Sequence, residues 1–178
     1  MRLERIGFFN VADDPQDLGA LCASKSAAFT ACPMAATDIA LMAFTSGTTG
    51  KPKAAIHTHG DVLAACEAWP RHVLKATPDD IVMGSPPLAF TFGLGGMLIF
   101  PMWAGASIYF PYIAYSPQAM ARLIHETRAT ICYMAPTFYR QMAPFMKDMA
   151  AQNGTPALRI CVSAGEALPD ATRTLWRE

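Results

Sequence analysis

Hydroxyl, glycine and lysine residues are concentrated in one nine-residue segment, 45–53, which reads TSGTTGKPK. Glycines let a backbone turn tightly and direct its N–H groups toward an anion, and serine and threonine hydroxyls add further donors. Lysine adds a positive charge that attracts phosphate. This combination favours the binding of a polyphosphate. The residues that we expect to contact phosphate are Thr45, Ser46, Gly47, Thr48, Thr49, Gly50 and Lys53.

Two well-known phosphate-binding motifs do not fit the sequence. A Walker A loop has a longer spacing between its glycines than the two residues that separate Gly47 and Gly50. The later run GLGG at 93–96 lacks the third glycine of a dinucleotide fingerprint, because Leu98 stands in that place. The polyphosphate interpretation of 45–53 therefore depends on its own residues.

Two histidines and an aspartate at alternate positions suggest a metal site as an alternative chemistry. His57, His59 and Asp61 match most of the HxHxDH motif of metallo-β-lactamase-like hydrolases, but Val62 occupies the final position. A two-metal hydrolase needs more ligands than the remaining histidines, His72 and His125, can supply. The same spacing suits a strand-to-helix junction with Thr58 or Asp61 as the helix cap. We therefore predict no metal site here.

Apolar runs alternate with amphipathic stretches from residue 38 onward, which predicts strands that alternate with helices. We expect strands at 39–44, 54–57, 81–85, 106–110, 130–134 and 158–162. We expect helices at 61–75 (with a kink at Pro70), 93–103, 117–127, 136–149 and from Pro169 onward. This order predicts an α/β fold with a mostly parallel sheet and helices on both faces.

Ligands of such sheets bind beyond the carboxyl ends of the strands. That rule selects three loops, 45–53, 86–96 and 163–168. In the second loop, Phe90 and Phe92 are two residues apart and face the same side if the segment is extended. Gly93 and Gly95 allow a ligand or another backbone to approach closely. Packing of the two aromatic rings in the core is the alternative.

Composition narrows the class of protein. The 178 residues carry 14 basic and 14 acidic side chains, so no basic excess indicates nucleic-acid binding. Hydrophobic residues make up 52% of the chain, which excludes intrinsic disorder. The mean hydropathy of +0.21 is high, but prolines and glycines interrupt the uncharged stretch 81–121, so we expect no membrane-spanning helix. Asp79 and Asp80, next to a proline, are interpreted as solvent-facing turn residues.

Cysteine usage indicates a reducing compartment. The five cysteines are widely spaced, form no CxxC pair and have an odd number, so we expect free thiols and a cytoplasmic protein. The first residues lack the apolar run of a signal peptide. Residues 1–37 show weak periodicity and are interpreted as a linker or the end of a preceding element.

Three motifs resemble those of AMP-forming acyl- and aryl-CoA synthetases, luciferases and peptide-synthetase adenylation domains. TSGTTGKPK, with His59 six residues after Lys53, resembles the phosphate loop of that family, although Ala54 stands where the family usually has glycine. PLAFTFGLGG at 87–96 resembles the motif at the acid pocket, and SAGEALP at 163–169 the segment that lies against adenine. The resemblance covers about residues 38–178 and implies part of the N-terminal, ATP-binding adenylating domain.

The resemblance implies a role for each motif. The phosphate loop would hold the β- and γ-phosphates of ATP. The acid pocket would be lined by Phe90, Thr91, Phe92 and Gly93, and adenine would be bordered by Gly165, Glu166 and Ala167. From the residues alone, Glu166 is equally a charge at the start of the helix that Pro169 opens.

Three stretches resemble the aryl-acid branch of the family, in particular 2-aminobenzoate- and benzoate-CoA ligases: HTHGDVLA at 57–64, WPRHVL at 69–74 and SPPLAFTFGLGG at 85–96. In the implied reaction, an aromatic carboxylate attacks the α-phosphate of ATP and releases pyrophosphate. The thiol of CoA then displaces AMP from the acyl adenylate. ATP, Mg²⁺ and CoA are the implied cofactors, and an aromatic carboxylic acid is the implied substrate.

Several of the family's functional residues have no counterpart in these 178 residues. They are the Mg²⁺-binding Glu, the ribose-binding Asp and the catalytic Lys of the lid domain. We therefore expect an internal piece of the large domain, without a complete catalytic set and inactive alone. We also expect copies to associate through exposed apolar surface. The alternative is a non-catalytic module of the same fold that binds a nucleotide or a partner.

Overall fold

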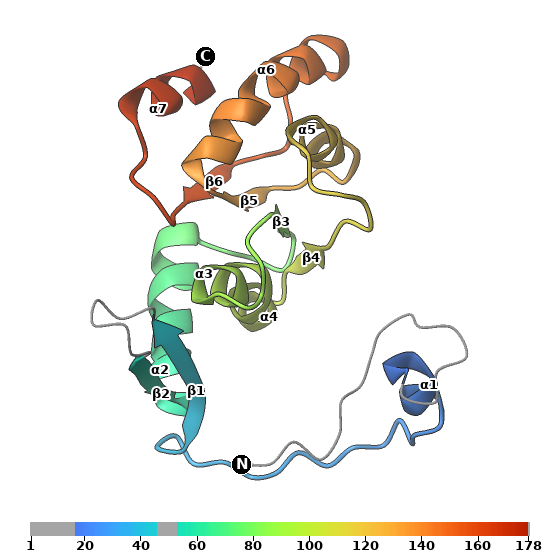
Figure 1. The fold of residues 1–178 in the computed structure, drawn as a ribbon, viewed down its shortest axis with the longest axis vertical. Coiled ribbons are helices and arrows are strands. Elements are labelled where there is room, and N and C mark those ends of the chain that lie inside the picture. The colour runs from blue at the N-terminus through green and yellow to red at the C-terminus, as the bar shows by residue number, and fades with distance from the viewer. Residues whose placement is uncertain (1–16, 46–52, 178) are drawn as a thin grey trace. The chain divides into compact units, whose positions relative to one another are not determined.

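The computed structural model describes residues 17–45 and 53–177 (Figure 1). The chain divides into two units, residues 1–34 and 35–178. In the first unit, helix α1 (Leu18–Ala23) begins at Asp17, whose carboxylate accepts a hydrogen bond from the Ala20 N–H at 2.9 Å. The second unit contains every other helix and strand of the described residues and all the described candidate site residues.

The first two strands of the second unit form an antiparallel hairpin. Strand β1 (Ile39–Thr45) pairs with β2 (Lys53–Thr58), with Met42 opposite Ile56 and Thr45 opposite Lys53. Both strands were predicted, but their expected place in the parallel sheet is wrong, because the two form a separate sheet of their own. The loop between them therefore closes a hairpin and does not follow a parallel strand.

The other four strands form the predicted parallel sheet. Its order is β4-β3-β5-β6, with β3 (Ile81–Gly84) and β5 (Ile131–Met134) inside, and β4 (Ser107–Tyr109) and β6 (Ile160–Ser163) at the edges. Both central strands are almost entirely buried, as expected of a parallel sheet that is covered on both faces.

Helices cover both faces of this sheet (Figure 1). On one face, Met83, Cys132 and Met134 pack in one cluster with residues of α5 (Pro117–Glu126) and α6 (Pro136–Asn153). On the other face, Val82, Ile131 and Tyr133 pack with Leu74 and Met97 of two π-helical segments. This alternation follows from the two-residue period of a strand, and it confirms the predicted α/β architecture.

The helices on the second face contain π-helical turns. Helix α2 (His59–Cys66) continues into the π-helix Glu67–Leu74, which contains Pro70 and ends at Lys75 with a φ of 49°. Helix α3 (Thr91–Leu94) continues through the π-helix Gly95–Ile99 into α4 (Phe100–Ala104). Because proline supplies no backbone N–H, the wider turn around Pro70 takes the place of the predicted kink.

An ion pair joins the amino ends of three strands. Asp80, which precedes β3 and is 3% exposed, accepts hydrogen bonds from Arg159 Nε (2.8 Å) and Thr130 Oγ1 (2.7 Å). Arg159 precedes β6 and also donates to the Leu74 carbonyl at 2.9 Å, and Thr130 precedes β5. The prediction that Asp80 faces solvent is therefore wrong, because a partner 79 residues later in the chain buries it.

The remaining described elements are short. Helix α7 (Asp170–Arg177) packs on α6, where the rings of Trp176 and Tyr139 meet edge to face with their centroids 4.8 Å apart.

Within residues 17–45 and 53–177, no helix combines the length and apolar character that crossing a membrane requires.

Candidate functional site

The two ends of the predicted phosphate loop, Thr45 and Lys53, form the last residue pair of the β1–β2 hairpin. Thr45 lies opposite Lys53 in the register, so the seven residues between them close the hairpin. Ser46, Gly47, Thr48, Thr49 and Gly50 lie outside the described residues. The backbone positions of Thr45 and Lys53 thus define where the predicted loop starts and ends.

The loop after β3 is held by close backbone contacts. A Cβ atom at Gly93 would lie 2.1 Å from the carbonyl oxygen of Pro87 and 2.7 Å from that of Pro86, so only glycine fits there. The Ser85 N–H donates to the Tyr133 carbonyl at 3.1 Å, which ties the start of the loop to β5. The sequence allowed close approach to Gly93 by either a ligand or another backbone, and the structure confirms the approach of another backbone.

The two phenylalanines of this loop do not share a side. Phe90 is extended, but a helix begins at Thr91, so the expected extended geometry through Phe92 is wrong. Phe90 is 66% exposed, whereas Phe92 is half-buried and its ring centroid lies 5.7 Å from that of Tyr133. The core-packing alternative thus describes Phe92 and fails for Phe90.

Tyr133, together with Trp69, supports Phe92, and no sequence motif indicated this contact. Tyr133 is 2% exposed, and its hydroxyl accepts a hydrogen bond from Trp69 Nε1 at 3.4 Å. Burial raises the pKa of Tyr133, while the bond from Trp69 opposes that rise. A Cβ at Gly96 would lie 2.5 Å from the Tyr133 ring, which explains this glycine. The apolar run of β5 predicted burial of Tyr133, but no local pattern indicated its partners.

Thr91 borders a small cavity of about 160 Å³ between the hairpin, α2 and the helices that follow β3. Leu41, His57 and Asp61 lie on the opposite walls. The cavity therefore places Thr91 near the hairpin that carries the phosphate loop, while the neighbouring Phe92 packs on Tyr133.

One of the suspected metal residues, Asp61, forms a helix cap with Thr58. Thr58 Oγ1 accepts a hydrogen bond from the Asp61 N–H at 3.1 Å, and Asp61 accepts one from the Thr58 N–H at 2.8 Å. These bonds to Thr58 lower the pKa of Asp61. The arrangement is a reciprocal capping box at the start of α2, which confirms the capping interpretation. The described residues include no group of three His, Cys, Asp or Glu side chains able to hold a metal ion.

The segment after β6 is a turn whose centre is open. Gly165 has a φ of +93°, which favours glycine, and a Cβ there would have no atom within 4 Å. Glu166 does not sit at the start of α7 as the second interpretation expected. Its Oε1 accepts hydrogen bonds from the N–H (2.9 Å) and the hydroxyl (2.7 Å) of Thr137, in the first turn of α6.

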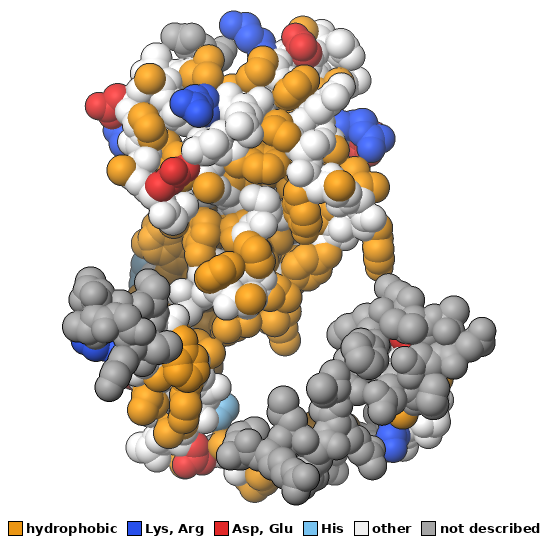
Figure 2. All heavy atoms as spheres, in the orientation of Figure 1, with side chains coloured by type: hydrophobic (Ala, Val, Ile, Leu, Met, Phe, Trp, Pro, Cys, Tyr) orange, Lys and Arg blue, Asp and Glu red, His pale blue; other side chains and the backbone are white. Residues whose placement is uncertain are grey.

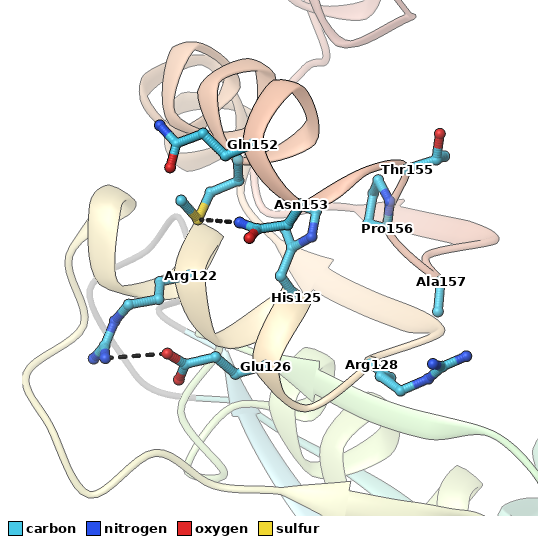
Figure 3. A pocket seen from close by; sticks show the side chains of 10 residues that line it. Arg122, His125, Glu126, Arg128, Gln152, Asn153, Thr155, Pro156 and Ala157 are labelled. Atoms are coloured by element: carbon cyan, nitrogen blue, oxygen red, sulfur yellow. Dashed lines mark hydrogen bonds and ion pairs between the residues drawn. The ribbon is translucent and has the colours of Figure 1, made fainter.

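A larger cavity, of about 530 Å³, lies at the opposite edge of the sheet (Figure 3). Figure 3 shows Arg122 and Arg128 pointing to opposite sides of it, with Arg122 paired to Glu126 at 3.3 Å. Arg128 follows the carboxyl end of α5, where the helix dipole favours positive charge. The cavity contains none of the predicted site residues.

The segments after β3 and β6, in which the sequence predicts the acid and adenine sites, thus follow strands of one parallel sheet. The sequence profile of the family described as "AMP-binding enzyme" matches residues 7–178. This chain belongs to that family. The match begins upstream of residue 38, where the motif resemblance starts.

Three proteins illustrate what this chain is similar to. Benzoate–CoA ligase of Thauera aromatica is 34% identical over 160 residues, which are 90% of this chain and 30% of that protein. The crystal structure of the anthranilate CoA ligase AuaEII in complex with anthranoyl-AMP has a TM-score of 0.72 at 38% identity, and the match covers 84% of this chain and 29% of that one. ATP-bound MatB of Rhodopseudomonas palustris gives 0.76 at 27% identity, over 90% of this chain and 31% of that one.

The 178 residues span about 30% of the length of these relatives. The predicted resemblance to aryl-CoA ligases and the α/β fold are both confirmed. Among residues 17–45 and 53–177, no cluster of three His, Cys, Asp or Glu side chains fits the Mg²⁺ that the family implies. No step through Mg²⁺ follows from this chain.

Proposed function

We propose that this chain forms the ATP- and aryl-acid-binding part of an ATP-dependent carboxylate–CoA ligase that acts on benzoate or 2-aminobenzoate in the cytoplasm. The complete two-step reaction, with CoA as acceptor, is proposed for a chain of the relatives' length. The observation that carries the proposal is the common edge: the loops that contain Phe92 and Gly165 both follow strands of one parallel sheet.

The hairpin supports the proposed role of segment 45–53. Pairing of Thr45 with Lys53 brings the two ends of the segment together, and the sequence of the segment supplies hydroxyls, N–H groups and lysines. Holding the ends of a donor-rich segment together lowers the entropy lost when its donors surround a polyphosphate. We propose that Thr45, Ser46, Gly47, Thr48, Thr49, Gly50 and Lys53 bind the β- and γ-phosphates.

The acid pocket is proposed around Thr91 and Phe92, with Phe90 and Gly93 beside them. The Phe92 ring packs on Tyr133, whose hydroxyl accepts a hydrogen bond from Trp69, and an aromatic ring suits contact with a flat aromatic acid. The anthranilate CoA ligase AuaEII was solved in complex with anthranoyl-AMP, whose acyl group is aromatic, and this supports the same class of acid here. Gly165, Glu166 and Ala167 are proposed to form the adenine side of the site.

Replacing Lys53 with alanine is expected to weaken ATP binding at least about tenfold, because one charge-assisted contact to phosphate is lost. Isothermal titration calorimetry with ATP on the 178-residue chain measures this change. Lys25→Ala, an exposed lysine of the first unit, is the control and should bind ATP like the unchanged chain. Equal affinities of the Lys53 and Lys25 variants would contradict the phosphate role.

Association between copies is proposed through the outer face of the hairpin. Met42, Phe44 and Ile56 are between 50% and 72% exposed there, and Figure 2 shows hydrophobic side chains gathered over β1 and β2. We expect Phe44→Lys to shift the chain toward monomer, because burial of a lysine ammonium in an apolar contact is unfavourable. Sedimentation velocity at several concentrations tests this, with Phe29→Lys in the first unit as the control. A monomer at every concentration for the unchanged chain would refute the proposal.

A further inference from the structure

Glu166 completes the start of a helix that lies 29 residues earlier in the chain. Helix α6 has Ala135 at its N-cap and Pro136 at its first position, and neither offers a side-chain acceptor. The N–H of Thr137 has no partner within the helix, as is general for the first turn. The carboxylate of Glu166 accepts from that N–H at 2.9 Å and from the Thr137 hydroxyl at 2.7 Å.

These bonds restrain the turn that precedes Glu166. Ser163 is paired with Met134 at the end of β6, and Glu166 is held by Thr137. Only Ala164 and Gly165 lie between these two restraints, and Gly165 has a φ of +93° with open space beside its Cα. The backbone is therefore held on both sides of Gly165, and the space beside its Cα is open.

We propose that Glu166 is a positioning residue for the nucleotide: it acts through Thr137 to fix the Gly165 turn and does not itself contact the base. This inference rests on the proposed function, in which Gly165 borders adenine, and it changes the role given to Glu166. Both acceptor contacts of the Glu166 carboxylate point to α6. They lower its pKa, and the charge of Arg140 adds to that effect, so the carboxylate is ionised and committed to the helix.

A double-mutant cycle tests this role. Glu166→Ala, Thr137→Val and the double variant are titrated with ATP and, separately, with inorganic tripolyphosphate, which has no base. We expect Glu166→Ala to weaken ATP binding about three- to tenfold, the size of a lost helix-cap contact, and to leave tripolyphosphate binding unchanged. Thr137→Val, which keeps the backbone bond, should cause a smaller loss. The double variant should bind ATP as weakly as Glu166→Ala alone.

Conservative variants and a measurement without nucleotide sharpen the test. Glu166→Gln and Thr137→Ser retain an acceptor and a hydroxyl, so both should keep most of the ATP affinity. In the free chain, hydrogen exchange of the Thr137 amide should be faster in Glu166→Ala, because the N–H loses its acceptor.

Each remaining outcome overturns the inference. Losses of ATP affinity in Glu166→Ala and in Thr137→Val that multiply in the double variant would show that the two residues act independently, as a direct contact of Glu166 with the base requires. ATP binding by all variants equal to that of the unchanged chain would remove any role for Glu166 and leave the proposed function standing. Failure of the unchanged chain to bind either ligand would refute the proposed function itself.

Discussion

Replacing Asp80 with asparagine is expected to lower the free energy of unfolding by about 2 to 3 kcal/mol at pH 7. The substitution removes a carboxylate that is 3% exposed and leaves the guanidinium of Arg159 without its ionic partner. The same carboxylate joins the segments before β3, β5 and β6, so its loss weakens the sheet at three strands together. Urea unfolding followed by circular dichroism measures the change.

The effect should depend on pH in a defined direction. Burial alone would raise the pKa of Asp80, but hydrogen bonds from Arg159, Thr130 and Thr77 and the charge of Arg159 lower it from 3.8 to about 2. A carboxylate with a lowered pKa in the folded state stabilises the protein above its ordinary value. That contribution is lost as the pH falls from about 5 toward 2. The difference between the unchanged chain and Asp80→Asn should therefore shrink over this range.

Asp79→Asn is the matched control, because Asp79 is the neighbouring residue and is exposed. It should change the free energy of unfolding by less than about 0.5 kcal/mol at any pH. Equal stabilities of the Asp79 and Asp80 variants at pH 7 would show that the ion pair does not hold the strands together.

Local sequence patterns predicted the helices and strands well, because burial of a strand or of one helix face requires a periodic pattern of apolar residues. The runs at Ile39–Thr45 and Ile131–Met134 became strands, and the stretch after Pro136 became a helix. The pairing of the strands was harder to predict from the sequence. The hairpin was placed in the parallel sheet, because an apolar run does not reveal which strand lies beside it.

The wrong predictions for individual residues have a common physical origin. Asp80, Phe92 and Glu166 are each positioned by a residue far away in the sequence: Arg159, Tyr133 and Thr137. A motif gives residue types and spacing, but it carries no information about such partners. The helix that starts at Thr91 also changes the direction of Phe92, which the two-residue spacing alone could not indicate.

The edge of the parallel sheet at the amino ends of its strands and the edge at their carboxyl ends are held by different contacts. The amino edge is fixed by a buried ion pair and its hydrogen bonds, and it offers no predicted site residue. The carboxyl edge carries the loops with Phe92 and Gly165, held by a few exposed or half-buried contacts. Variants at the amino edge, such as Asp80→Asn, should therefore change stability without altering the proposed ligand site.

Replacing Gly93 with alanine is expected to cause the largest loss at the carboxyl edge, about 3 kcal/mol of unfolding free energy together with loss of aryl-adenylate binding. The new Cβ would lie 2.1 Å from the Pro87 carbonyl oxygen, and both groups belong to backbone, so no side chain can move aside. The loop after β3 must shift, and Thr91 and Phe92 shift with it.

Thermal unfolding and titration with a non-hydrolysable benzoyl- or 2-aminobenzoyl-adenylate measure the two consequences of Gly93→Ala. Gly19→Ala is the control: its Cβ would meet only the end of the Asp17 side chain, at 3.0 Å, and alanine favours the helix there. Unchanged adenylate affinity in a folded Gly93→Ala chain would place the acid pocket elsewhere. Loss of adenylate binding with retained binding of tripolyphosphate would instead separate the acid pocket from the phosphate loop, because the hairpin does not depend on the contact between Gly93 and Pro87.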